Sequence, residues 1–247
     1  MKTALSKMIT ALLIIFAVSM AQAATDKHER VLIVVSELQQ HGPENLRLLY
    51  TAVEDLTRVQ SNIILGDDYK QVIHLRRTQA TLSSFKAVLR FQAAKNDVKA
   101  IDVIMSLHGS PGKLFFREGE VETDVMTSTI LQSSSAAETI LVNKLKKKLR
   151  MVYNLSCFGR SHNQAFRNMG FDVTVGSNGI NANSEIEFIA VLTAWSFGST
   201  FGGAFDATNN DGALAAADLP VRATGINADS RKYFRGDQAT KIGTAAE

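Results

Sequence analysis

Internal disulfide bonds are excluded from this chain, because its 247 residues include one cysteine, Cys157. An excess of charge is also lacking, since 27 basic residues face 24 acidic ones. A basic stripe able to bind nucleic acid is therefore not expected. Beyond the first 25 residues no apolar run is long enough to cross a membrane. What the chain does have is 45% hydrophobic residues, which is enough for one sizeable core.

The first residues have the pattern of a secretory signal. Lys2 and Lys7 precede a short apolar stretch over residues 9–20, and Ala21 and Ala23 supply small residues at a cleavage position. We expect a cleaved signal over residues 1–23 and export to the periplasm or the exterior, with an uncleaved N-terminal anchor as the alternative. Loss of both lysines leaves 25 basic against 24 acidic residues. We therefore expect a soluble exported protein that does not bind nucleic acid or, once cleaved, the membrane.

Apolar runs of strand length alternate with helical patterns along the chain. This alternation predicts a three-layer α/β/α sandwich around a mainly parallel sheet, wound as in flavodoxin. Its strands are expected at residues 30–36, 69–76, 101–107, 151–155 and 171–175. A hairpin is expected over residues 113–121, and helices over residues 43–60, 81–93, 133–149, 161–169 and 185–197. The first of these helices is predicted from its apolar residues at helical spacing, which are Leu46, Leu49, Val53, Leu56 and Val59.

Two reactive side chains follow successive predicted strands. His108 comes directly after residues 101–107, and Cys157 comes two residues after the strand that ends at residue 155. In an open parallel sheet, functional groups gather at the carboxyl ends of the strands. Neighbouring strands lie ~5 Å apart, so we expect the imidazole and the thiol to meet at one edge of the sheet. A thiol next to an imidazole can serve as a nucleophile, with the imidazole as general base and then general acid.

Gly109 follows the histidine where a substrate backbone has to approach. Its N–H and that of Cys157 are the predicted donors to a tetrahedral oxyanion. Asp102 lies too far down its strand to be expected as a third catalytic member, and a dyad suffices.

An apolar strand ending in His-Gly, followed 49 positions later by one ending in Ser-Cys, resembles the caspase-like cysteine peptidases. That group includes caspases, legumains, gingipains and separases, and a His-to-Cys separation of ~50 residues is typical of caspases. The resemblance covers roughly residues 29–219 and implies a caspase-like fold and a cysteine-dependent endopeptidase acting on peptides or proteins. The Gln-Ala-Cys-x-Gly signature of caspases is absent, since Leu155-Ser-Cys-Phe-Gly stands there, so cleavage after aspartate is not implied.

Several other residues are weaker candidates. His162, five residues past Cys157, is the rival base, although we expect it to point outward from a helix. A specificity pocket could be lined by the four residues Arg160, Ser177, Asn178 and Asp206, for which structural turn roles are as plausible. Residues 209–218 resemble a calcium-binding loop, but the first ligand position of that pattern falls on Ala207, one residue from Asp206. Calcium is therefore a possible ligand, and an Asx turn that caps a helix fits better. No zinc motif and no other cofactor motif is present.

The sequence therefore predicts a cysteine peptidase with His108 and Cys157 as its catalytic residues. Its predicted parts are a signal at residues 1–23, a peptidase domain at 24–224 and a polar, partly disordered tail at 225–247. The main alternative is a caspase-like fold that serves as a non-catalytic binding module. A flavodoxin-like small-ligand binder is disfavoured, because no phosphate-binding glycine follows the first strand until Gly42. The sequence leaves the preferred substrate residue, self-processing and oligomeric state open.

Overall fold

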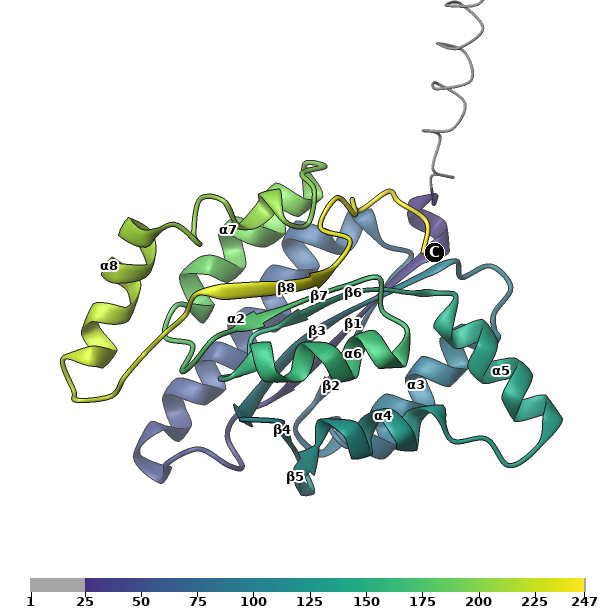
Figure 1. Ribbon diagram of the computed structural model, residues 1–247, viewed down its shortest axis with the longest axis horizontal. Coiled ribbons are helices and arrows are strands. Elements are labelled where there is room, and N and C mark those ends of the chain that lie inside the picture. The colour runs from purple at the N-terminus through teal and green to yellow at the C-terminus, as the bar shows by residue number, and fades with distance from the viewer. Residues whose placement is uncertain (1–24, 247) are drawn as a thin grey trace, which may run out of the picture.

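A computed structural model describes residues 25–246, so the predicted signal lies outside the described residues. Six strands form the main sheet in the order β2-β1-β3-β6-β7-β8 (Figure 1). The first five run parallel, and β8 pairs antiparallel with β7. The strands are β1 (Arg30–Glu37), β2 (Gln71–Arg76), β3 (Ala100–Ser110), β6 (Leu149–Asn154), β7 (Val173–Ser177) and β8 (Lys232–Gly236). The predicted mainly parallel sheet is therefore confirmed.

Helices cover both faces of this sheet (Figure 1). One face carries α3 (Leu82–Ala94), α4 (Thr123–Leu131), α5 (Ala136–Lys146) and α6 (Asn163–Met169); the other carries α2 (Arg47–Leu65) and α7 (Ser184–Ser196). The helix α8 (Asp211–Arg222) lies beyond α7. None of the described helices is long and apolar enough for a membrane span.

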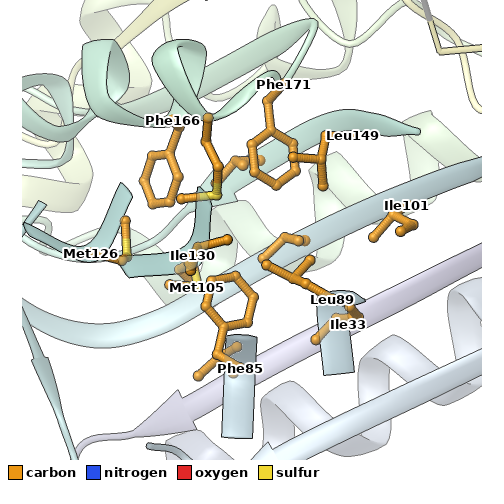
Figure 2. Close-up of a cluster of buried hydrophobic side chains, with 14 of the residues drawn as sticks. Ile33, Phe85, Leu89, Ile101, Met105, Met126, Ile130, Leu149, Phe166 and Phe171 are labelled. Carbon is orange, nitrogen blue, oxygen red and sulfur yellow. The ribbon is translucent and has the colours of Figure 1, made fainter. Parts of the chain in front are cut away.

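Two hydrophobic cores fill the spaces between the layers. β1 is buried along its whole length and alternates between them, with Ile33 in one core and Leu32 in the other. Figure 2 shows the first core, where Phe85 of α3 and Phe166 of α6 gather over the sheet. Full burial on both faces is what requires nearly continuous apolar strands, and it anchors the strand ends that carry His108 and Cys157.

The predicted hairpin is present as β4 (Lys113–Phe116) and β5 (Gly119–Glu122), which pair antiparallel. β4 also pairs antiparallel with the end of β3. The turn that connects β3 to β4 contains Gly112 at a φ of +75°, a conformation that glycine adopts without strain. The hairpin lengthens β3 past His108, so the histidine is held by backbone pairing on its far side.

The prediction of a partly disordered tail after residue 224 is wrong. β8 lies within that segment and pairs with β7 over five residues. Farther on, Nη1 of the buried Arg150 donates to the carbonyl oxygens of Ile242 and Thr244, at 2.5 and 2.6 Å. Within β8 only Lys232 is fully buried, and the half-buried and exposed residues that follow it suit a strand at the edge of the sheet.

The apolar stripe of the first helix is not its most buried face. Leu49 and Leu56 of α2 are 56% and 40% exposed, whereas Glu54, Thr57 and Ser61 are buried. The two hydroxyls donate to carbonyls of their own helix, at 2.9 and 2.5 Å, which lets them be buried with a partner. Glu54 has a partner of another kind, described below.

Candidate active site

The register of the central strands brings the two predicted reactive residues to one edge. Met105 of β3 pairs with Asn154 of β6, and the N–H of Leu155 donates to the carbonyl of Met105 at 2.8 Å. His108 and Cys157 each lie three residues beyond that pair. Both side chains line a single cavity of about 200 Å³, and their catalytic roles remain a prediction.

Gly109 lets the two strand ends approach closely. A Cβ atom at this position would lie 2.5 Å from the carbonyl oxygen of Cys157 and 3.0 Å from Cβ of Ser156. A methyl group cannot occupy that space without moving backbone. A glycine is therefore required directly after His108 for the imidazole and thiol to share one cavity.

His108 is held through one ring nitrogen. Its Nε2 atom lies 2.8 Å from the carbonyl oxygen of Leu38, just past β1. Because a carbonyl only accepts, Nε2 carries the proton and Nδ1 keeps a free lone pair in the neutral ring. The ring of Tyr50 packs edge-on against the imidazole, with centroids 4.9 Å apart. Burial lowers the pKa of His108, and the hydrogen bond to Leu38 opposes that shift, so the resting imidazole is neutral at pH 7.

The Leu38 carbonyl is itself held in place by a buried carboxylate. One carboxylate oxygen of Glu54 accepts the N–H of Leu38 at 2.6 Å and that of Gln39 at 3.3 Å, and the other accepts the Gln39 side chain at 3.0 Å. Glu54 is fully buried. The inward-facing polar side of α2 thus fixes the loop after β1, and through it the orientation of His108.

Cys157 is a half-buried free thiol. Burial raises its pKa, while the backbone N–H groups of Asn181 and of Cys157 itself lower it by hydrogen bonding to the sulfur. Directly after it, Phe158 adopts a left-handed conformation at φ +56°, with its N–H donating to the carbonyl of Gly179 at 2.8 Å. Strained backbone of this kind persists where the surroundings hold it in place, and here it turns the chain away after the thiol.

A buried polar network holds Asn181 at the cavity of the dyad. Its side-chain amide donates to the Leu155 carbonyl at 2.8 Å and accepts from Nζ of Lys232 at 3.0 Å. The same ammonium lies 2.9 Å from Glu187, and both of these side chains are fully buried. Asn181 is thereby fixed between β6 and β8, at the cavity that Cys157 also lines.

His162, the rival base, is placed otherwise than predicted. It does not point outward but is fully buried, at the end of the short 3-10 helix Gly159–His162. Its Nδ1 lies 3.0 Å from the amide of Asn154, and its Nε2 lies 2.8 Å from the carbonyl of Ser110. Both ring nitrogens are occupied by structural contacts, so His162 braces the loops at the ends of β3 and β6.

The predicted pocket residues are not gathered at the cavity of the dyad. Arg160 donates to Asn178 at 2.8 Å and stacks over the ring of Tyr233, 4.1 Å from its centroid, in a separate hollow. Ser177 is buried and donates to the Ser156 carbonyl at 3.1 Å. Asp206 lines a third hollow. Their proposed role in substrate binding remains a prediction only.

Asp102 and the segment near Asp211 have structural partners. Both carboxylate oxygens of Asp102 bond the buried Arg150 at the far end of β3 and β6. Asn210 caps α8 by accepting the N–H of Ala213 at 3.0 Å, as an Asx turn would. Within residues 25–246, no three His, Cys, Asp or Glu side chains are grouped to hold a metal ion.

The sequence analysis missed Leu38, Tyr50, Glu54 and Asn181. A backbone carbonyl such as that of Leu38 has no residue signature. Glu54 left no distinct signal either, because it stands next to Asp55 in a helix with charged residues on its polar side.

Comparison with known proteins supports the fold. The chain is similar to the solved structure of caspase-1 from Spodoptera frugiperda, with 11% identity, a TM-score of 0.51 and coverage of 91% of this chain and 93% of that one. It is also similar to iotapain, a secreted C11 cysteine protease from Bacteroides thetaiotaomicron, at 10% identity and a TM-score of 0.43. That match covers 69% of this chain and 58% of the iotapain chain.

Comparisons with protein-family profiles and with curated proteins found no match. The structural likeness therefore establishes the fold class and leaves activity open. The chain has the caspase-like fold, a mainly parallel sheet between two layers of helices, as the strand-end motifs predicted.

Proposed function

We propose that this chain is an exported cysteine peptidase that hydrolyses peptide bonds in peptides or proteins. The observation that carries the proposal is that His108 and Cys157 line one cavity at adjacent strand ends. The Leu38 carbonyl occupies Nε2 of His108 at 2.8 Å, which leaves Nδ1 to accept a proton from the thiol. Export rests on Lys2, Lys7 and the apolar stretch that follows.

The reaction begins from a neutral pair, because burial lowers the pKa of His108 and raises that of Cys157. As the sulfur attacks the scissile carbonyl carbon, Nδ1 of His108 takes the thiol proton and the carbonyl oxygen becomes an oxyanion. The backbone N–H groups of Gly109 and Cys157 are the proposed donors to that oxyanion.

Collapse of the tetrahedral intermediate breaks the carbon–nitrogen bond. The imidazolium gives its proton to the leaving amine, and an acyl thioester remains on Cys157. Water then attacks the thioester carbon while Nδ1 again takes a proton, the carbon–sulfur bond breaks, and the proton returns to the sulfur. The Leu38 carbonyl stabilises the imidazolium in both halves, since it accepts a stronger hydrogen bond from the charged ring.

The test is digestion of a peptide library by the purified chain, with and without added calcium, read by mass spectrometry. Cys157→Ala and His108→Ala should each abolish cleavage, whereas His28→Ala, at an exposed histidine, should leave it intact. Cleavage that survives Cys157→Ala, or an inert wild type under both calcium conditions, rejects the proposal.

One observation favours the second candidate, a non-catalytic binding module. Burial raises the pKa of Cys157, as it does for an inert structural thiol. The two candidates predict different reactions of Cys157 with a peptide-based electrophile. In a peptidase, His108→Ala abolishes the reaction of the thiol with this probe. In a binding module with a merely accessible thiol, the reaction persists in His108→Ala.

A further inference from the structure

The cavity that holds the dyad extends between α2 and α7. It measures about 200 Å³ and is reached from the ends of β1, β3 and β6, where Leu38, Leu107 and Leu155 line its wall. An engineered apolar cavity of about 150 Å³ binds benzene, so this one has room for a branched aliphatic side chain or a phenyl ring.

The walls of this cavity are mostly apolar. Besides the three leucines, Ile180 lines it from the loop after β7, and Phe188 lines it from α7. Among the residues that the structure describes, no lysine or arginine lines it. An acidic side chain would thus lose its hydration there without a counter-ion, which is costly.

The cavity also offers little stabilisation to a basic side chain of a substrate. Glu185 is the one carboxylate among the described lining residues. It is half-exposed in the first turn of α7 and accepts the Ser184 hydroxyl at 2.9 Å. A lysine or arginine would have to bury its stem among the leucines and still bring its charge to this partly hydrated carboxylate. An uncharged apolar side chain has no such requirement.

We propose that this cavity is the specificity pocket of the proposed peptidase and receives a bulky apolar side chain, such as leucine, methionine or phenylalanine, beside the scissile bond. The inference rests on the proposed function and adds its substrate class. It departs from cleavage after charged residues, because leucines and isoleucine stand at the strand ends where a charged partner would be needed.

The test uses fluorogenic peptides that differ only in the residue before the cut bond: Leu, Phe, Ala, Lys and Asp. We expect kcat/KM for Leu or Phe to exceed that for Ala by at least about 10-fold and that for Asp or Lys by at least about 100-fold, within the range that pocket contacts discriminate. Val53→Phe fills the pocket from α2, where Val53 lines it. This variant should lower kcat/KM for the Phe peptide by at least about 10-fold and spare the Ala peptide.

The matched control is Ala52→Phe, which adds the same ring at the neighbouring exposed position of α2 and should not alter the order of preference. Fastest cleavage of the Lys or Asp peptide overturns this inference and leaves the proposed peptidase standing. An unchanged order of preference in Val53→Phe does the same. Absence of cleavage of every peptide overturns both. If Val53→Phe fails to fold, judged by its circular dichroism, the wild-type panel alone decides.

Discussion

Replacing Glu54 with alanine should misplace His108 without touching it. In the native chain the Glu54 carboxylate accepts the backbone N–H of Leu38 at 2.6 Å, and the Leu38 carbonyl accepts Nε2 of His108 at 2.8 Å. Alanine removes this acceptor and leaves the buried Leu38 N–H without a partner. The Gln39 N–H and side chain also lose their contacts, but Gln39 is half-exposed and water can replace them.

The cost follows from those contacts. An unpaired buried donor costs about 1–3 kcal/mol, so we expect Glu54→Ala to lower the free energy of unfolding by about 2 kcal/mol. For a chain of this size the midpoint of thermal unfolding should fall by roughly 4–8 °C. A freed Leu38 carbonyl also lets the imidazole move, and a displacement of about 1 Å can reduce kcat/KM by about 100-fold.

Two variants separate positioning from general destabilisation. Glu54→Gln keeps an oxygen for the two backbone N–H groups and removes the charge that raises the pKa of His108. It should recover most of the activity and shift the acid limb of the pH–rate profile to lower pH. Leu65→Ala, at the buried C-terminal end of the same helix, should cost about 2–5 kcal/mol and leave kcat/KM of the folded protein unchanged.

The measurements are thermal unfolding by circular dichroism, and kcat/KM against pH at a temperature well below the midpoint of unfolding. The reasoning is refuted if Glu54→Ala is destabilised as expected but keeps wild-type kcat/KM and an unaltered pH profile. Glu54 would then serve the fold alone.

Three further predictions concern the strand ends and the histidines. Gly109→Ala places a methyl group 2.5 Å from the Cys157 carbonyl, so kcat/KM should fall by about 100-fold or more while circular dichroism still reports a folded chain; retained activity would contradict the required close approach. Because burial raises the pKa of Cys157, iodoacetamide should alkylate the native chain at pH 7 more slowly than the urea-unfolded chain, and faster native alkylation would refute a neutral resting pair. His74 has its pKa lowered to about 4, chiefly by burial, so the unfolded state binds more protons between about pH 4 and 6.5. The stability that His74 contributes is complete above pH 6.5 and lost as pH falls toward 4. Chemical denaturation of His74→Gln should therefore show a smaller loss over that window, and an equal loss would contradict the assignment.

The layout of the central sheet could be predicted from sequence because its strands are buried on both faces. Residues 30–36 and 101–107 are nearly continuous apolar runs, and the polar or glycine residues after them mark the edge of the sheet where function gathers. The juxtaposition of His108 and Cys157 then follows from the pairing of β3 with β6. This much depends on chain order and periodicity alone.

The remaining features depend on tertiary partners that no local pattern records. β8 is a short edge strand with two aromatic residues next to charged ones, and its pairing with β7 is settled by register with Val173–Ser177 rather than by its own composition. The inward face of α2 could not be deduced from its apolar stripe, because a buried carboxylate there bonds two backbone N–H groups of a loop distant in sequence.

Buried polar side chains, rather than the hydrophobic cores, set the positions of the reactive atoms. Glu54 holds the loop after β1, His162 braces the ends of β3 and β6, and Asn181, fixed by Lys232, holds the loop after β7 against β6. Each contact ties a side chain to backbone or to another buried polar group. Such groups cost several kcal/mol when left unpaired, so each loop has one low-energy arrangement. The cores hold the sheet together, and these contacts fix the strand ends and loops that bring the imidazole and the sulfur to one cavity.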